Sequence, residues 1–280
     1  AALVIAIGRG DLRNLQSLLL DHNLISLGYT SAAGAAAAED GTAALPPPGA
    51  KPIGVEFGRA LTQLPELIEV DLSSNANVTD PFAARFIGAL LVAGSALRSV
   101  HLGATKAGDA CADAVAAAWS LQPPIALRCL CLSSLVSDTG ARALAAALPR
   151  ATALRELLLG DKISSNGVVA LTDVWKDRAA CASCQLSSLV LGGEVRSGVL
   201  LRNAIDAEAI EALADLPRSH ASLTDLRLSG NDRIGAEACV RLLACLEGSS
   251  AKRCTLRTLH IDNCGLTKEH ATAFLEALDH

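Results

Sequence analysis

The sequence predicts an α/β solenoid, in which one strand and one helix recur along the chain and the strands form a parallel sheet. Three observations predict this fold. A six-residue pattern, L-x-x-L-x-L with Val or Ile at a few positions, occurs eight times. Successive occurrences begin 52, 30, 30, 27, 32, 37 and 33 residues apart, a period typical of repeat proteins. Alanine- and leucine-rich segments with helical spacing lie between them, as in residues 140–148.

Each occurrence of the pattern predicts a short strand, because its last two apolar positions are separated by one residue and therefore share a face. The eight occurrences begin at Leu15, Leu67, Leu97, Leu127, Leu154, Leu186, Leu223 and Leu256. A strand that is followed by a helix and then by a strand of the same sense builds a parallel sheet. Stacked repeats then bury leucines that an isolated repeat would leave in water.

This arrangement resembles the ribonuclease-inhibitor-like subclass of leucine-rich repeats, whose pattern continues with Asn or Cys at the ninth position. The ninth position is Asn23, Asn75, Asn231 and Cys264 in four repeats, and Thr105, Leu135, Lys162 and Glu194 in the others. The resemblance covers about residues 12–280. It implies a right-handed horseshoe of about eight repeats, with the parallel sheet on the concave face and helices on the convex face, and it indicates little about function.

We expect residues 1–280 to form a single leucine-rich-repeat domain. Residues 1–7 resemble the tail of a preceding repeat's helix, and helices are expected over 53–64, 81–92, 140–148 and 268–278 and from residue 206 onward. Residues 31–50, rich in Ala, Gly and Pro, are predicted to be an insertion on the rim. Residues 192–205 contain a second insertion, whose Val and Leu residues either form a contact site or pack against the adjoining loop. Both ends of the array are expected to be covered by further repeats or a partner.

The cysteines and tryptophans are interpreted as structural residues. The nine cysteines are odd in number and follow the repeats, which favours reduced thiols and a cytoplasmic, reducing location. Cys181 and Cys184 have metal or redox spacing, but a single C-x-x-C is more often a loop with two buried thiols. Trp119 and Trp175 lie in predicted helices, where packing is more common than binding.

Composition and motifs argue against several classes of function. The net charge is −5 and aromatic residues make up 2%, which argues against a nucleic-acid surface. No apolar run approaches the roughly 18 residues of a membrane helix. The sequence contains no phosphate-binding loop, dinucleotide fingerprint, zinc-protease motif or nucleophile elbow. We therefore expect no catalytic residues, no metal, no cofactor and no small-molecule substrate.

The predicted strands present two sets of side chains that do not serve the core. Together they form an acidic patch, an apolar middle and a polar end, a distribution that protein interfaces tend to have. The predicted partner-binding residues are Glu69, Asp71, His101, Cys131, Leu158, Val190, Asp225, Arg227 and His260. Mere variation of a solvated surface is the alternative.

The leading functional hypothesis is a scaffold module that binds a partner polypeptide through its concave sheet and rim loops, as a subunit of a larger assembly. A GTPase-activating protein resembling the Ran activator is the alternative from another class. No catalytic residue can be assigned to it here, and the long acidic tail of that family is missing. A third hypothesis, the sensor repeats of an intracellular immune receptor, predicts a nucleotide-binding domain upstream.

Overall fold

A computed structural model describes most of the chain. The described residues are 2–23, 53–92, 95–121, 124–177, 182–194, 200–219, 222–247 and 254–270. The predicted rim insertion at residues 31–50 lies outside these ranges, as do Cys181 and residues 271–280.

An eight-stranded sheet runs through the whole array, in the order β1-β2-β3-β4-β5-β6-β9-β10. All seven pairings between neighbouring strands are parallel. Each strand contains the second apolar position of one L-x-x-L-x-L pattern, so the predicted parallel sheet is confirmed. The strands are β1 (Ser17–Leu19), β2 (Glu69–Asp71), β3 (Ser99–Leu102), β4 (Cys129–Ser137), β5 (Glu156–Lys162), β6 (Ser188–Val190), β9 (Asp225–Arg227) and β10 (Thr258–His260).

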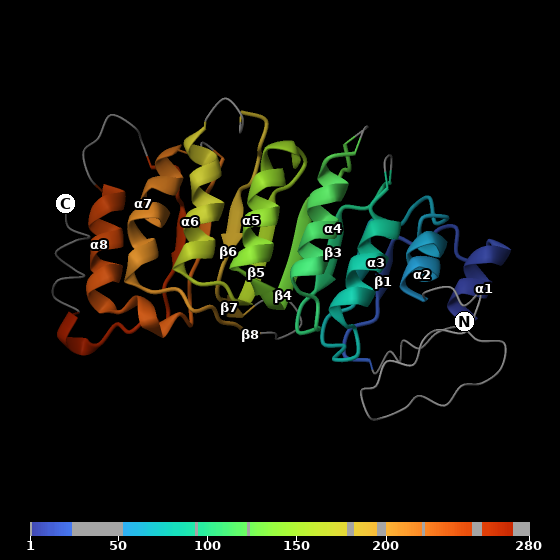
Figure 1. Ribbon diagram of the computed structural model, residues 1–280, viewed down its shortest axis with the longest axis horizontal. Coiled ribbons are helices and arrows are strands. Elements are labelled where there is room, and N and C mark those ends of the chain that lie inside the picture. Colours follow the sequence, from blue (N-terminus) through green and yellow to red (C-terminus); the bar gives the residue numbers. More distant parts are fainter. Residues whose placement is uncertain are drawn as a thin grey trace.

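The helices stand side by side in a second layer in front of the sheet, with α1 and α8 at opposite ends of the row (Figure 1). Helix α1 precedes β1, and each later helix lies between two strands of the sheet in chain order. Neighbouring helices of the row pack on one another. The chain is a repeat solenoid. The helices are α1 (Ala2–Arg9), α2 (Ile53–Leu61), α3 (Asp80–Leu90), α4 (Asp109–Trp119), α5 (Asp138–Ala147), α6 (Ser165–Asp173), α7 (Ile210–Ser219) and α8 (Ala236–Glu247).

The helices differ from the expected ranges mainly at their ends. The helix expected over 53–64 stops at Leu61, and the helix expected over 81–92 begins one residue earlier, at Asp80. The segment expected to be helical from residue 206 begins as the short 3-10 helix η4 (Ala207–Ala209) and continues into α7. Of the helix expected over 268–278, the described residues contain only the 3-10 turn η6 (Lys268–His270).

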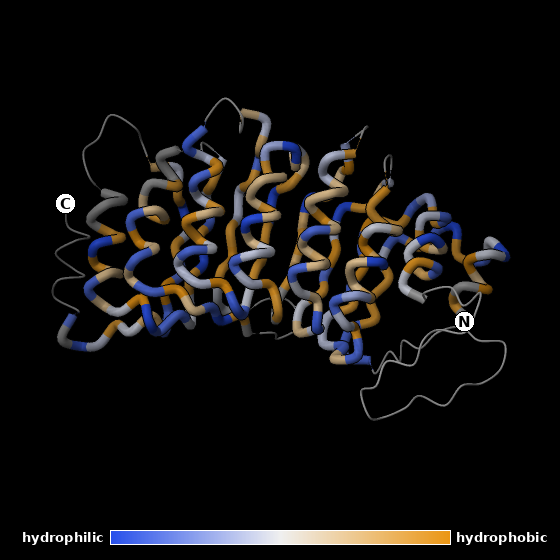
Figure 2. The backbone as a smooth tube through the Cα atoms, viewed as in Figure 1, coloured by the Kyte–Doolittle hydropathy of each residue, from blue (hydrophilic) through white to orange (hydrophobic). Residues whose placement is uncertain are grey.

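The main core lies between the two layers and is filled by the strand leucines. Leu130, Leu157 and Leu189, which are register partners on three neighbouring strands, are completely buried. In Figure 2 each helix carries both hydrophobic and hydrophilic residues, as expected for helices with one buried side. Each buried leucine contributes about 1.5–3 kcal/mol through removal of its apolar surface from water. The core therefore extends along the whole array.

Both tryptophans belong to this core, which confirms their interpretation as packing residues. Trp119 is the last residue of α4, and Trp175 lies in the 3-10 helix η2 (Val174–Lys176). Their side chains are 2% and 1% exposed. Neither is available to a ligand.

An aspartate near the start of one helix holds the start of the next helix. The Asp80 carboxylate accepts hydrogen bonds from the backbone N–H groups of Gly108, Ala110 and Cys111, at 2.7–3.0 Å. Asp109 does the same for α5, and Asp138 for α6. The first N–H groups of a helix have no partner inside the helix, and negative charge is favourable there. This aspartate series links the helices of the layer to one another.

Candidate functional site

The strand register brings the predicted binding residues together on the sheet face that the helices do not cover, which we call the open face. The first row runs across the sheet through Ser17, Glu69, Ser99, Cys129, Glu156, Ser188, Asp225 and Thr258. The second row runs through Leu19, Asp71, His101, Cys131, Leu158, Val190, Arg227 and His260. All nine predicted residues lie in these two rows, which are two residues apart along each strand.

Carboxylates in the first row are bound by small side chains of the neighbouring strand. The Ser17 hydroxyl donates to Glu69 Oε2 at 3.2 Å, and Ser188 donates to Asp225 Oδ2 at 3.0 Å. Between them, the Cys129 thiol lies 3.4 Å from a Glu156 carboxylate oxygen. These cross-strand contacts orient the acidic groups.

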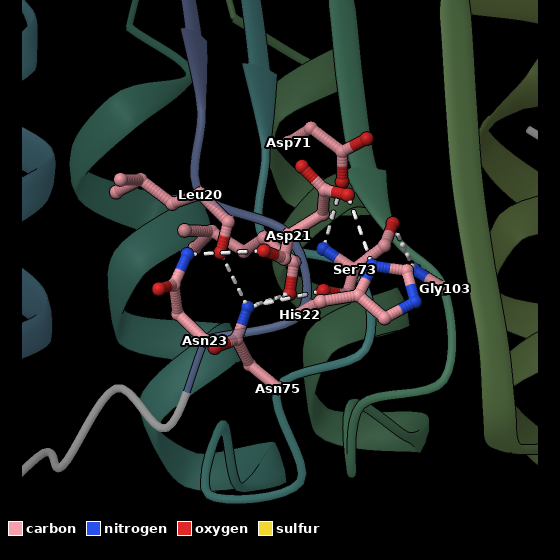
Figure 3. Close-up of polar contacts among 9 residues, drawn as sticks. Leu20, Asp21, His22, Asn23, Asp71, Ser73, Asn75 and Gly103 are labelled. Carbon is pink, nitrogen blue, oxygen red and sulfur yellow. Dashed lines mark hydrogen bonds and ion pairs between the residues drawn. The ribbon is translucent and has the colours of Figure 1, made fainter. Parts of the chain in front are cut away.

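At the acidic end of the open face, Glu69 is the accessible group. Its side chain is 25% exposed, and its Oε1 lies 3.7 Å from Nε2 of the nearly buried His101. Asp71 is only 8% exposed and accepts a hydrogen bond from the Ser73 backbone N–H at 2.7 Å. Figure 3 shows Asp71 and Ser73 close to each other. Asp71 therefore holds its own loop.

The predicted apolar middle is not exposed. Cys131, Leu158 and Val190 are 2%, 6% and 1% exposed, and together with Leu201 they form a second apolar cluster. Leu201 is completely buried and belongs to the second insertion. The expectation of an exposed apolar centre was wrong because Leu201 of this insertion packs against these side chains.

A two-stranded element places Leu201 over the cluster. In the second insertion, β7 (Gly193–Glu194) pairs antiparallel with β8 (Leu200–Leu201). A side chain at Gly160 would place its Cβ 3.2 Å from the Leu201 side chain, so glycine provides the space. Of the two interpretations of this insertion, packing therefore holds for Leu201. Burial also raises the pKa of the Cys131 thiol to about 12, with a smaller contribution from Asp71.

Asparagines at the ends of the strands hold the rim loops. The Asn75 amide donates to the carbonyl oxygens of Leu20, Leu72 and Ser73 at 2.8–3.0 Å (Figure 3). Asn231 donates in the same way to the carbonyls of Leu191 and Leu228. Such side chains satisfy buried backbone carbonyls that the strands leave unpaired.

In the sixth repeat the sequence pattern assigned the wrong residue to this position. The expected residue, Glu194, lies in β7, and Asn203 occupies the asparagine position instead. Its amide donates to the carbonyls of Leu159 and Leu191 at 2.9 Å, and its Oδ1 accepts from the Ile163 N–H. The insertion displaces the asparagine along the sequence but not in space. The one available signal was an asparagine shortly before the next helix.

At the carboxyl ends of β6, β9 and β10 the surface forms a polar hollow of about 480 Å³. It lies beside the open face, because Arg227 and His260 of the second row contribute to its wall. Sequence reasoning named these two side chains but not the hollow, because its other walls come from the second insertion and the rim loops. The lining residues are Gly192, Gly193, Arg202, Arg227, Ser229, Gly230, Asp232, His260, Asp262 and Asn263.

Within the described part of the chain, no group of three His, Cys, Asp or Glu side chains is arranged to bind a metal ion. Seven cysteines in this part of the chain are free: Cys111, Cys129, Cys131, Cys184, Cys239, Cys254 and Cys264. Among the described helices, none has the length and apolar character needed to cross a bilayer.

Comparison with known proteins adds little information about this site. No protein-family model matches the chain, and no curated protein matches it. Among solved structures, it is similar to a chain in the crystal structure of the Rad7 and Elc1 complex in yeast, with a TM-score of 0.45 and 19% identity. The match covers 79% of this chain and 50% of that chain, so the chain spans about half of that neighbour's length. The fold assignment therefore depends on the strand pairing described above.

Proposed function

We propose that the chain is a protein-interaction module that holds a partner polypeptide on its open face, as a subunit of a larger assembly. One observation carries this proposal. The two rows place oriented polar and charged side chains across eight strands, on a side of the sheet where the helices do not pack. We take this side to be the concave face of a right-handed arc of the ribonuclease-inhibitor-like type.

Partly accessible side chains run along the first row of the proposed surface, including Glu156 in its middle, and charged groups also lie towards both ends. Glu69 provides negative charge at one end, and Arg227 and His260 provide donors at the other, on either side of the covered apolar cluster. Charges placed in this way steer a partner and fix its orientation more than they add to affinity. A partner segment with a basic group opposite Glu69 fits this distribution. Asp71, His101, Cys131, Leu158 and Val190 support the surface from beneath.

A cytoplasmic or other reducing location forms part of the proposal. It is supported by the free cysteines of the described residues, since secreted domains commonly join such residues in disulfides. We also propose that the module has no enzymatic activity. No contact described above favours a GTPase-activating protein or an immune sensor over a plain scaffold.

The test is affinity capture with the full chain and two matched double variants. Glu69→Gln/Arg227→Gln removes one charge of each sign from the open face. Glu237→Gln/Arg142→Gln makes the same change at exposed positions of α8 and α5. We expect the open-face variant to lose a wild-type partner by at least about tenfold, a change of about 1.4 kcal/mol, while the helix variant retains it. Both variants should keep the wild-type circular dichroism spectrum.

Two results would contradict the proposal. The first is a folded open-face variant that holds the same partner as tightly as the wild type. The second is release of the partner by the helix variant alone. Either result would move the interface to the helix layer or to the ends of the array.

A further inference from the structure

We infer that the polar hollow binds a segment of the partner polypeptide in which an acidic and a basic side chain lie close together. This inference rests on the proposed function, because the hollow opens beside the open face and shares Arg227 and His260 with it. It adds the chemical class of the segment that binds there. Four features of the hollow support it.

The first feature is an oriented guanidinium group. Arg227 Nε donates to Asp225 Oδ2 at 3.0 Å, and the same oxygen accepts from the Ser188 hydroxyl. This contact fixes the guanidinium plane through Nε. Both terminal nitrogens remain available to a ligand, because the described residues supply no hydrogen bond to them. The Arg227 side chain is 38% exposed. A planar guanidinium held in this way can bind a carboxylate through two parallel N–H bonds.

The second feature is a second arginine whose backbone is held in place. The backbone N–H of Arg202 donates to Asp161 Oδ1 at 2.9 Å, and its side chain is exposed. Its aliphatic stem passes Gly230, since a Cβ added there would lie 3.6 Å from Arg202 Cγ. Gly193 and Gly230 have φ angles of +93° and +82°, which disfavour any other residue. These two positions therefore contribute no side chain to the hollow.

The third feature is the presence of negative charge in the same hollow. Asp232 is exposed, and Asp262 Oδ2 accepts from the Ser229 hydroxyl at 2.9 Å. Among the described residues, no ion pair joins Arg202 or Arg227 to either of these aspartates. A doubly charged phosphate would be repelled by both carboxylates. A ligand that carries one charge of each sign complements both pairs of residues.

The fourth feature is access. The hollow is open to solvent along one side, and Arg227 and His260 continue into the second row. Small-molecule sites generally bury most of their ligand. An open depression at the end of a row of side chains instead suits a side-chain pair on an extended polypeptide.

The test uses the full chain labelled with nitrogen-15 and a pentapeptide blocked at both ends, acetyl-Gly-Glu-Ser-Lys-Gly-amide. The amide signals of Gly193 and Gly230 report on the hollow directly. We expect saturable shifts of these signals, weakened about tenfold by Arg227→Gln and unchanged by Arg257→Gln, which alters an exposed arginine outside the hollow. A peptide with Gln in place of both charged residues should bind at least about tenfold more weakly.

Three outcomes would overturn the inference. The first is that the charged peptide shifts neither glycine signal, and the second is that the Gln peptide shifts both equally. The third is that free glycine at the same concentration binds as well as the peptide. The last result would identify a small-molecule site. Failure of this inference can be distinguished from failure of the proposed function. If the pentapeptide does not bind but Glu69→Gln still releases the partner, the open-face interface stands and only the binding site in the hollow is disproved.

Discussion

The Asp138 carboxylate accepts two hydrogen bonds from Ser164, one from its backbone N–H at 2.8 Å and one from its hydroxyl at 2.6 Å. Asp138 is the first residue of α5, whereas Ser164 caps the N-terminus of α6. The Ser164 hydroxyl in turn accepts from the Asn166 N–H. One carboxylate thus orders the start of the helix in the following repeat, so neighbouring repeats are coupled by a specific polar contact as well as by leucine packing.

Removing this carboxylate should destabilise the array. We expect Asp138→Ala to lower the free energy of unfolding by about 2 kcal/mol, because it deletes two charge-assisted bonds at a helix N-terminus. Urea unfolding followed by circular dichroism measures the loss, and hydrogen exchange should show faster opening at the start of α6. Asp173→Ala is the control, since its exposed contact with Lys176 should contribute less than about 0.5 kcal/mol. Equal urea midpoints for the two variants would contradict the conclusion that these aspartates stabilise the contact between neighbouring repeats.

Two helical glycines should respond in opposite directions to alanine. A Cβ at Gly167 would lie 2.5 Å from Asp138 Oδ1, so Gly167→Ala should cost about 1–3 kcal/mol. A Cβ at Gly88 in α3 meets nothing within 4 Å, so Gly88→Ala should stabilise the protein by about 0.5–1 kcal/mol. Thermal unfolding of both variants checks the signs. A stabilised Gly167→Ala protein would show that the carboxylate does not lie against α6.

Asn203 should be more important for stability than its place after an insertion suggests. Asn203→Ala removes the side-chain partner of the Leu159 carbonyl and of the Ile163 N–H, and one of the two amide donors to the Leu191 carbonyl, which Asn231 still contacts. We expect a loss of at least about 2 kcal/mol. Among the described residues, the exposed Asn23 donates to the nearby Asp21 carbonyl alone, so Asn23→Ala should have a much smaller effect. Urea midpoints compare the two, and similar midpoints would contradict the assignment of Asn203 to the rim.

Cys131 should be unreactive as long as Leu201 covers it. With its pKa raised from 9.0 to about 12, the thiol carries about a thousandfold less thiolate at pH 8 than an ordinary cysteine. Reactivity should therefore stay low until the pH approaches 12 or the cluster opens. Leu201→Ala opens the cluster, and alkylation of Cys131, followed by mass spectrometry, should accelerate at least about tenfold. Rapid alkylation in the wild-type protein would show that the insertion does not cover the sheet.

The strand register was predictable because a strand has a period of two residues. Once Leu130 and Leu157 are assigned to the core, Cys131 and Leu158 must lie on the other face and must be neighbours in a parallel sheet. The same reasoning places Arg227 beside His260, as the register of β9 and β10 has it. Local patterns were sufficient here because each repeat buries its leucines in the same way.

The covering of the open face could not be predicted, because no periodicity links residues 200–201 to strands far away in the sequence. Leu201 packs against Leu158 through a contact that depends on the path of a glycine-containing insertion. The displaced Asn203 was hidden for the same reason. The aspartate series did leave a signal that was overlooked, since Asp80, Asp109 and Asp138 recur every 29 residues at the starts of helices.

Photo-crosslinking tests the central claim most directly, because it reports which face touches the partner. A photoreactive amino acid at Thr258 lies at an exposed position of the first row, and one at Arg142 lies on the exposed side of α5. The account predicts that the partner captured by the full chain is crosslinked from position 258 and not from position 142. Crosslinks from position 142 alone, in a chain with the wild-type circular dichroism spectrum, would contradict it.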